Sequence, residues 1–230
     1  MRVQRLGDAA FLVSGFGEVP AYRLASAIES CRVRGVVEAV AAYDTVGVYG
    51  EPFAIDPAEL EASISRLLPS LEREPEPQPV VHEIPVCYAL GPDLGEVARR
   101  LDLTPEAVVR RHTGSSYTCH AIGFCPGFPY LGYLPEPLCG LPRLDRPRPK
   151  VEPGSVAIVG RQTGIYPLPR PGGWWLIGRT PLLIVDVEAG FFPIEPGDRV
   201  RFRKIDEDEF ARRAGERLPS SVRPTRAGAE

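Results

Sequence analysis

Hydrophobic and polar residues alternate with two different periods along the first third of the chain. Runs with the two-residue period of a strand lie at 9–13, 36–42 and 45–49. Two helical patterns separate them, and the clearer one is 57–68, where Asp56 can cap the helix and Glu59 completes a capping box. The apolar residues of this helix share one face: Leu60, Ile64, Leu67 and Leu68. The pattern predicts a small α+β domain at residues 1–72.

A proline-rich, charged stretch from Pro69 to Pro79 interrupts these periods. Proline removes backbone donors and favours extended chain, so the stretch predicts a linker rather than a regular element. We place this linker at residues 73–80, between the first domain and a second one at 81–205.

Short strand-like runs separated by glycine and proline dominate the second region. A strand at 81–87 and two short helices at 94–101 and 105–112 come first. Further strand-like runs lie at 117–122, 155–160, 174–178, 182–187 and 199–203. This spacing predicts a compact β-barrel or sandwich. Residues 206–230 are expected to form one last helix, opened by acidic residues, and a disordered tail from Pro219.

Composition excludes several classes of protein. The 230 residues carry a net charge of −3, whereas a nucleic-acid-binding protein usually shows a strong basic excess. The apolar runs are too short to cross a membrane, and the N-terminus lacks the apolar core of a signal peptide. Five scattered cysteines without a CxxC pair are typical of reduced thiols. We therefore expect a soluble, cytoplasmic protein.

Two features resemble common sites without matching them. Cys119, His120 and Cys125 do not have the spacing of a zinc site, so no metal is predicted. The helices at 94–112 resemble a helix-turn-helix that would present Arg110 and Arg111 to DNA. The alternative is a helical hairpin packed on the barrel, and we favour it. Nearly all basic residues of this chain are arginines, so an arginine carries little information about ligands.

Two segments offer candidate chemistry. The segment 123–132 is rich in glycine, proline and aromatic residues, so it predicts a rigid loop that either plugs a barrel end or forms a binding wall. A strand followed by a polar turn places Gln162, Thr163 and Tyr166 within five residues, and such neutral groups suit recognition of an amide or a carboxylate. Stabilisation of the turn is the alternative.

Three aromatic side chains complete the set of candidates. His112 closes a helix and is the best candidate for a general acid or base among the three histidines. Trp174 and Trp175 are expected to point to opposite faces of a strand, one into the core and the other toward a cleft or an interface.

Six ordered motifs between His112 and Pro181 resemble one known family. They are His-Thr at 112, Tyr-Thr at 117, Ile-Gly-Phe-x-Pro-Gly-Phe-Pro-Tyr-Leu ending at 131, Pro-Gly-Ser ending at 155, Gln-Thr-Gly-Ile-Tyr-Pro ending at 167, and Pro-Gly-Gly-Trp ending at 174 and leading to Ile-Gly-Arg-Thr-Pro. The chain is similar to the KipI/PxpB family, also called allophanate hydrolase subunit 1 or the carboxyltransferase C/D domain. The N-terminal region fits more loosely.

The resemblance implies a fold, an activity and partners. The implied fold is an N-terminal α+β domain followed by a cyclophilin-like β-barrel. The implied activity is that of an ATP-dependent 5-oxoprolinase subunit, working with a KipA/PxpC-like and a LamB/YcsF-like subunit and sharing ATP with a partner. Two alternatives stay open: an inhibitor of a histidine kinase, and one half of an allophanate hydrolase or a biotin-dependent carboxyltransferase.

Six residues of the second region are predicted to form the site. We assign catalytic roles to His112 and Gln162. We assign substrate binding to Thr163, Tyr166, Phe128 and Arg148. His112, Gln162, Thr163 and Tyr166 are expected to gather at one mouth of the barrel, close to the 123–132 loop. No nucleotide-binding loop is visible in the sequence, so ATP is expected at a subunit junction or largely on the partner.

Overall fold

The computed structural model describes residues 1–219 and divides into two compact units, Met1–Gln78 and a second one that begins at Pro79. Each unit has its own hydrophobic core. The predicted fold class is confirmed, because the second unit contains a closed β-barrel of seven strands and the whole is a mixture of α and β elements. In the described part of the chain, no helix is long and apolar enough to span a membrane.

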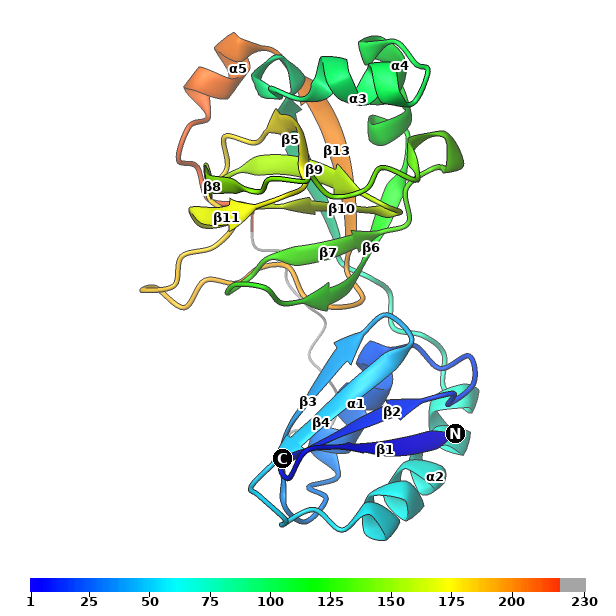
Figure 1. The fold of residues 1–230 in the computed structure, drawn as a ribbon. Coiled ribbons are helices and arrows are strands. Elements are labelled where there is room, and N and C mark those ends of the chain that lie inside the picture. The colour runs from blue at the N-terminus through cyan, green and yellow to red at the C-terminus, as the bar shows by residue number, and fades with distance from the viewer. Residues whose placement is uncertain (220–230) are drawn as a thin grey trace. The chain divides into compact units, whose positions relative to one another are not determined.

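The first unit is a four-stranded antiparallel sheet with two helices (Figure 1). Its strands, in the order β1-β2-β4-β3, are Arg2–Leu6, Ala10–Ser14, Thr45–Gly50 and Val36–Ala42. Helices α1 (Ala21–Ser30) and α2 (Pro57–Arg73) pack on one face of the sheet. The core is apolar because alternate strand residues such as Val13 and Val48 point toward Leu24 and Ile64 of the helices.

The proline-rich stretch is helical from Pro69 to Arg73, where the sequence predicted no regular element, and only the residues after it are extended. Helix α2 continues through Pro69 to Arg73, and the backbone becomes extended only at Glu74. A proline near a helix end removes one backbone hydrogen bond. Leu68 and Leu71, on either side of Pro69, pack against the core and offset that loss. Strand β1 was not predicted either, since its exposed residues alternate only weakly.

Seven strands close the barrel of the second unit in the order β10-β7-β6-β13-β5-β12-β9. In chain order they are β5 (Val81–Cys87), β6 (Ser116–Ile122), β7 (Pro129–Gly132), β9 (Ser155–Val159), β10 (Gln162–Ile165), β12 (Trp175–Arg179) and β13 (Arg199–Ile205). All neighbours are antiparallel except β13 and β5, which run parallel. Because the barrel is closed, it exposes no edge strand for unwanted pairing.

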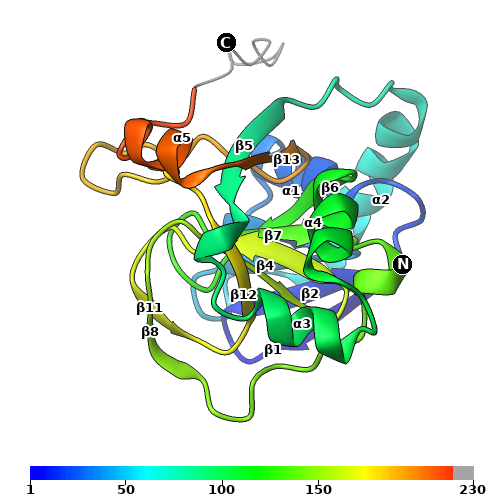
Figure 2. The same ribbon diagram turned by 90° about the horizontal axis from the view of Figure 1, so that it is seen from above.

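A small antiparallel sheet of two strands, β8 (Arg148–Val151) and β11 (Arg170–Gly172), lies alongside the barrel (Figure 2). Strands β7, β8, β10 and β11 were not predicted, because each is only three or four residues long and most contain glycine or proline. Conversely, the strand predicted at 182–187 is a loop with isolated bridges at Leu183 and Asp186. Leu182, Ile184 and Val185 are buried without regular pairing, whereas Val187 is exposed.

Helices α3 (Leu94–Arg100) and α4 (Pro105–Thr113) form a hairpin at one end of the barrel (Figure 1). Val97 and Val108 are fully buried in the barrel core, and α4 contacts β13. This packing supports the helical-hairpin interpretation over a DNA-binding one.

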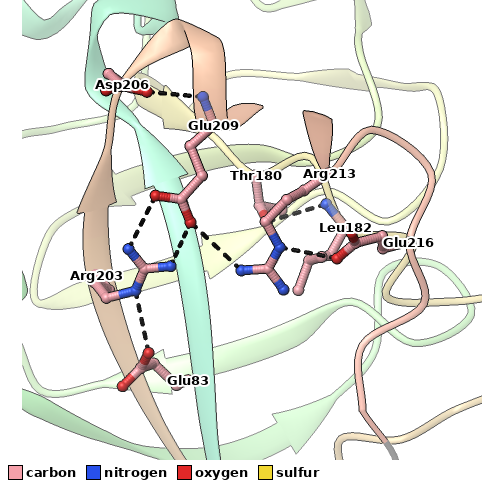
Figure 3. Close-up of polar contacts among 8 residues, drawn as sticks. All are labelled: Glu83, Thr180, Leu182, Arg203, Asp206, Glu209, Arg213 and Glu216. Atoms are coloured by element: carbon pink, nitrogen blue, oxygen red, sulfur yellow. Dashed lines mark hydrogen bonds and ion pairs between the residues drawn. The ribbon is translucent and has the colours of Figure 1, made fainter. Parts of the chain in front are cut away.

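Charged side chains fix the last helix, α5 (Glu207–Arg212), against the barrel (Figure 3). Arg203 on β13 forms ion pairs with Glu83 on β5 and with Glu209 on α5. Glu209 also pairs with Arg213. Each exposed pair contributes little, but a network of this kind sets the position of the helix. The predicted last helix is thus confirmed, whereas most of the predicted tail lies outside the described residues.

Two neighbouring glycines provide a test of how the chain before and within α3 packs against the barrel. A methyl group on Gly91 would clash with the backbone of Ile177, whereas one on Gly95 in α3 would meet nothing within 4 Å. We expect Gly91→Ala to destabilise the barrel by about 1–3 kcal/mol through overpacking. Gly95→Ala, the control, should stabilise it by about 0.5–1 kcal/mol. Both tryptophans, Trp174 and Trp175, lie in the second unit, so denaturant unfolding followed by their fluorescence measures this unit. Equal effects of the two substitutions would contradict the packing.

Candidate functional site

Strand β10 divides the predicted site residues between the two faces of the barrel wall. Thr163 and Ile165 point into the barrel and are fully buried. Gly164 faces outward, where a methyl group would lie 2.9 Å from the ring of Phe128. The expected single cluster is therefore two clusters, one inside the wall and one outside.

Inside the barrel, His112 joins Tyr88 and Thr163 in a chain of hydrogen bonds. Its Nδ1 lies 2.7 Å from the Tyr88 hydroxyl, and its Nε2 lies 3.0 Å from Thr163 Oγ1. Thr163 Oγ1 donates to the carbonyl of Ala157, so its oxygen is left to accept from His112. The bonds therefore assign the ring proton to Nε2, and Nδ1 accepts from Tyr88. A neutral histidine satisfies every member of the chain.

His112 is sealed by its surroundings. It is 0% exposed, and its ring stacks on Phe202 with centroids 4.4 Å apart. Burial lowers the pKa of His112 to about 3, because the charged form would lose its hydration. A general acid or base must reach the proton that it transfers. The geometry thus supports a structural role for His112 and Thr163, and the catalytic role assigned to His112 stays a prediction.

Outside the wall, aromatic side chains form a pocket of about 210 Å³. It is lined by Phe124, Phe128, Tyr130, Arg143, Pro147, Tyr166, Pro171, Gly172, Gly173 and Trp174. Phe128 is at the centre of the cluster, with ring centroids 5.0 Å from Tyr130, 5.2 Å from Tyr166 and 5.4 Å from Trp174 in edge-to-face contacts. The pocket combines segments that are distant in the sequence: the 123–132 loop, the end of β10 and the two-stranded β8–β11 sheet.

Two of the predicted substrate-binding residues, Phe128 and Tyr166, belong to this pocket. The expectation that the 123–132 segment forms a binding wall fits it as well, although residues 129–132 are a barrel strand. Gln162 lies on β10 opposite Gly132 and does not line the pocket. The expected turn at 162–166 is thus mainly a strand.

Arg148, the last predicted substrate-binding residue, is engaged within the protein. Its guanidinium forms an ion pair with Asp93 at 2.5 Å and reaches the carbonyl of Trp174 at 3.4 Å. The other carboxylate oxygen of Asp93 accepts from the backbone N–H of Leu176 on β12. Asp93 and Arg148 therefore attach the two-stranded β8–β11 sheet to the barrel, and this pair positions the pocket wall. Arg148 supports the site rather than facing it.

Gly172 and Tyr166 pack in direct contact. A methyl group on Gly172 would clash with the Tyr166 hydroxyl, so only glycine leaves room for this ring. The hydroxyl also bonds to the backbone of Trp174, and burial raises the pKa of Tyr166 above its ordinary value. Tyr166 is therefore a neutral phenol whose oxygen accepts this bond from the backbone N–H of Trp174, and the bond fixes the pocket wall.

The tryptophan pair is oriented as predicted. Trp175 packs in the barrel core and donates its indole N–H to Pro142, while Trp174 belongs to the outer aromatic cluster and lines the pocket. Sequence reasoning missed Tyr130 and Arg143. Because nearly all basic residues of the chain are arginines, a single arginine carried no signal in the sequence. Only the fold shows that Arg143 lies beside the Pro-Gly-Gly turn. Among residues 1–219, no group of three or more His, Cys, Asp or Glu side chains could hold a metal ion.

Fold and site together define a protein of carboxyltransferase C/D type. The sequence matches the family described as carboxyltransferase domain, subdomains C and D, over residues 1–190, and the chain belongs to this family. It is 35% identical to the B subunit of 5-oxoprolinase from Bacillus subtilis (strain 168), and the alignment covers 91% of this chain and 95% of the relative. It is also 51% identical to the B subunit of 5-oxoprolinase from Escherichia coli O157:H7, over 55% of this chain and 59% of the relative.

Solved structures show the same fold in different contexts. The crystal structure of TTHA0988 matches with a TM-score of 0.72 and 36% identity over 94% of this chain, which spans 41% of that longer chain. PH0987 from Pyrococcus horikoshii, described as a conserved uncharacterized protein, matches with a TM-score of 0.52 and 36% identity over 91% of this chain and 100% of its own length. The K. lactis urea amidolyase, 18% identical with a TM-score of 0.65 over 94% of this chain and 16% of its own, shares the fold alone.

The buried histidine predicts a pH dependence of stability. Between about pH 6.5 and pH 3, the unfolded chain binds a proton at His112 that the folded chain does not. Folding therefore loses stability as the pH falls through this range, by at most about 1.4 kcal/mol per pH unit from this group. We expect His112→Gln to flatten the dependence of the unfolding free energy on pH between 7 and 4. Should this variant fail to fold, an NMR titration of the wild type replaces it. A His112 ring that titrates near pH 6.5 in the folded protein would contradict the buried neutral state.

Proposed function

We propose that this chain is one subunit of an ATP-dependent 5-oxoprolinase, which converts 5-oxoproline, ATP and water to glutamate, ADP and phosphate in the cytoplasm. Its partners would be a KipA/PxpC-like and a LamB/YcsF-like subunit. The observation that carries this proposal is the similarity to the 5-oxoprolinase subunit of Bacillus subtilis along nearly the whole length of both chains. The Escherichia coli relative has the same name, and this favours an oxoprolinase over a histidine-kinase inhibitor or half of a biotin-dependent carboxyltransferase.

The outer pocket does not fit a nucleotide. Its volume of about 210 Å³ is below the roughly 300–1,000 Å³ of pockets for drug-sized ligands, and one arginine is the only charged residue among the described residues that line it. A triphosphate normally needs several backbone N–H groups or cations. We therefore place ATP on a partner subunit or at a junction with one. The share of this chain in the reaction would be to bind and orient the small substrate, which lowers the barrier by positioning.

A reconstitution assay tests the proposal. We expect the purified chain to release no glutamate from 5-oxoproline and ATP, and the three-subunit mixture to do so. Mixtures that each omit one subunit are the controls and should be inactive. Full turnover by the single chain, or a complete mixture that hydrolyses no 5-oxoproline, would contradict the proposed role.

A further inference from the structure

Arg143 is the only charged residue that lines the outer pocket, and it has no partner within residues 1–219. No hydrogen bond or ion pair in that range involves its guanidinium, whereas Arg148, five residues later, is paired with Asp93. In the same range, no acidic residue lines the pocket. An unpaired arginine beside a wall of aromatic rings is a site for an anion, because guanidinium pairs well with carboxylate.

The backbone on both sides of Arg143 is held in place. Pro142 accepts the indole N–H of Trp175 at 2.7 Å, and the N–H of Leu144 donates to Gly173 at 2.8 Å. Arg143 is thereby fixed relative to Gly173 and the neighbouring Trp174. A group that is positioned before binding loses less entropy when the ligand arrives.

Tyr130 supplies a second polar group to the same region. Its hydroxyl has no hydrogen-bond partner within the described residues, and burial raises the pKa of Tyr130, so the phenol keeps its proton at neutral pH. The positive charge of Arg143 lowers the pKa of both Tyr130 and Tyr166, in opposition to burial. The guanidinium therefore lies near the two rings. A carboxylate at Arg143 could thus also accept a bond from Tyr130.

The rest of the lining is apolar and favours a small ring. Phe128 and Trp174 are almost fully buried, and Pro147 and Pro171 complete the wall. A five- or six-membered ring suits such a lining, since flat apolar faces gain from contact with aromatic rings. A ligand with an ammonium group would bring a second positive charge next to Arg143. The described lining has no acidic group to pair with that charge, so binding it would be costly in a partly desolvated site.

The geometry points to the outer pocket as a binding site for a small cyclic carboxylate without an ammonium group, with its carboxylate on Arg143 and Tyr130 and its ring against Phe128 and Trp174. The choice of ligand rests on the proposed function: 5-oxoproline is such a molecule, since its lactam nitrogen is neutral. Glutamate carries an ammonium group and no ring. The pocket therefore distinguishes the substrate of the proposed reaction from its product.

Ligand titrations test this inference on the full-length chain, followed by tryptophan fluorescence and calorimetry. The probes are 5-oxoproline, 2-pyrrolidone, which lacks the carboxylate, and proline, which has an ammonium group. We expect 5-oxoproline to bind at least tenfold more tightly than either analogue. Arg143→Gln should weaken binding of 5-oxoproline by about 10- to 100-fold, the loss of one charge-assisted contact. Arg146→Gln is the matched control, because Arg146 is exposed on the same segment and does not line the pocket.

Each outcome separates the pocket from the proposed function. Binding of proline as tight as that of 5-oxoproline, or unchanged binding by Arg143→Gln, overturns the inference. If the isolated chain binds no probe, the KM for 5-oxoproline of the reconstituted enzyme decides, and equal KM values for Arg143→Gln and Arg146→Gln overturn it. If binding depends on Arg143 but the enzyme mixture hydrolyses no 5-oxoproline, the assignment of the pocket stands and the oxoprolinase role is rejected.

Discussion

The hydrogen-bonded chain of Tyr88, His112 and Thr163 is the interaction on which the second unit depends. It crosses the barrel interior, where an unsatisfied polar group would be costly, and it leaves no member without a partner. The remaining interior is filled with apolar side chains of the core. Because the inside is occupied, it leaves no room for a ligand, whereas the aromatic pocket on the outer surface of the wall does.

The outer surface becomes a site through a second layer of structure. Gly164 leaves space on β10 for the ring of Phe128, and Gly172 leaves space for Tyr166. The pair of Asp93 and Arg148 attaches the two-stranded β8–β11 sheet, which carries the opposite wall. Packing, an ion pair and two glycines thus create a pocket whose shape is set before any ligand binds, as expected for a site that works by positioning.

The sequence predicted the α+β class and most long elements, because their periods and caps are local signals. It failed where the information is not local. Short strands such as β7 and β10 depend on barrel neighbours for pairing, so their glycines and prolines suggested loops. His112 was recognised as titratable, but its burial is a property of the fold. Arg148 and Arg143 look alike in sequence, and only the partner at Asp93 shows which of them is free for a ligand.

A crystal structure of the full-length chain with bound 5-oxoproline tests the central claim most directly, namely that the barrel interior is filled and the ligand site lies outside it. We expect ligand density between Phe128 and Trp174, with the carboxylate within hydrogen-bonding distance of Arg143 and the Tyr88–His112–Thr163 chain unchanged. Density for the ligand inside the barrel, in contact with His112, would contradict it.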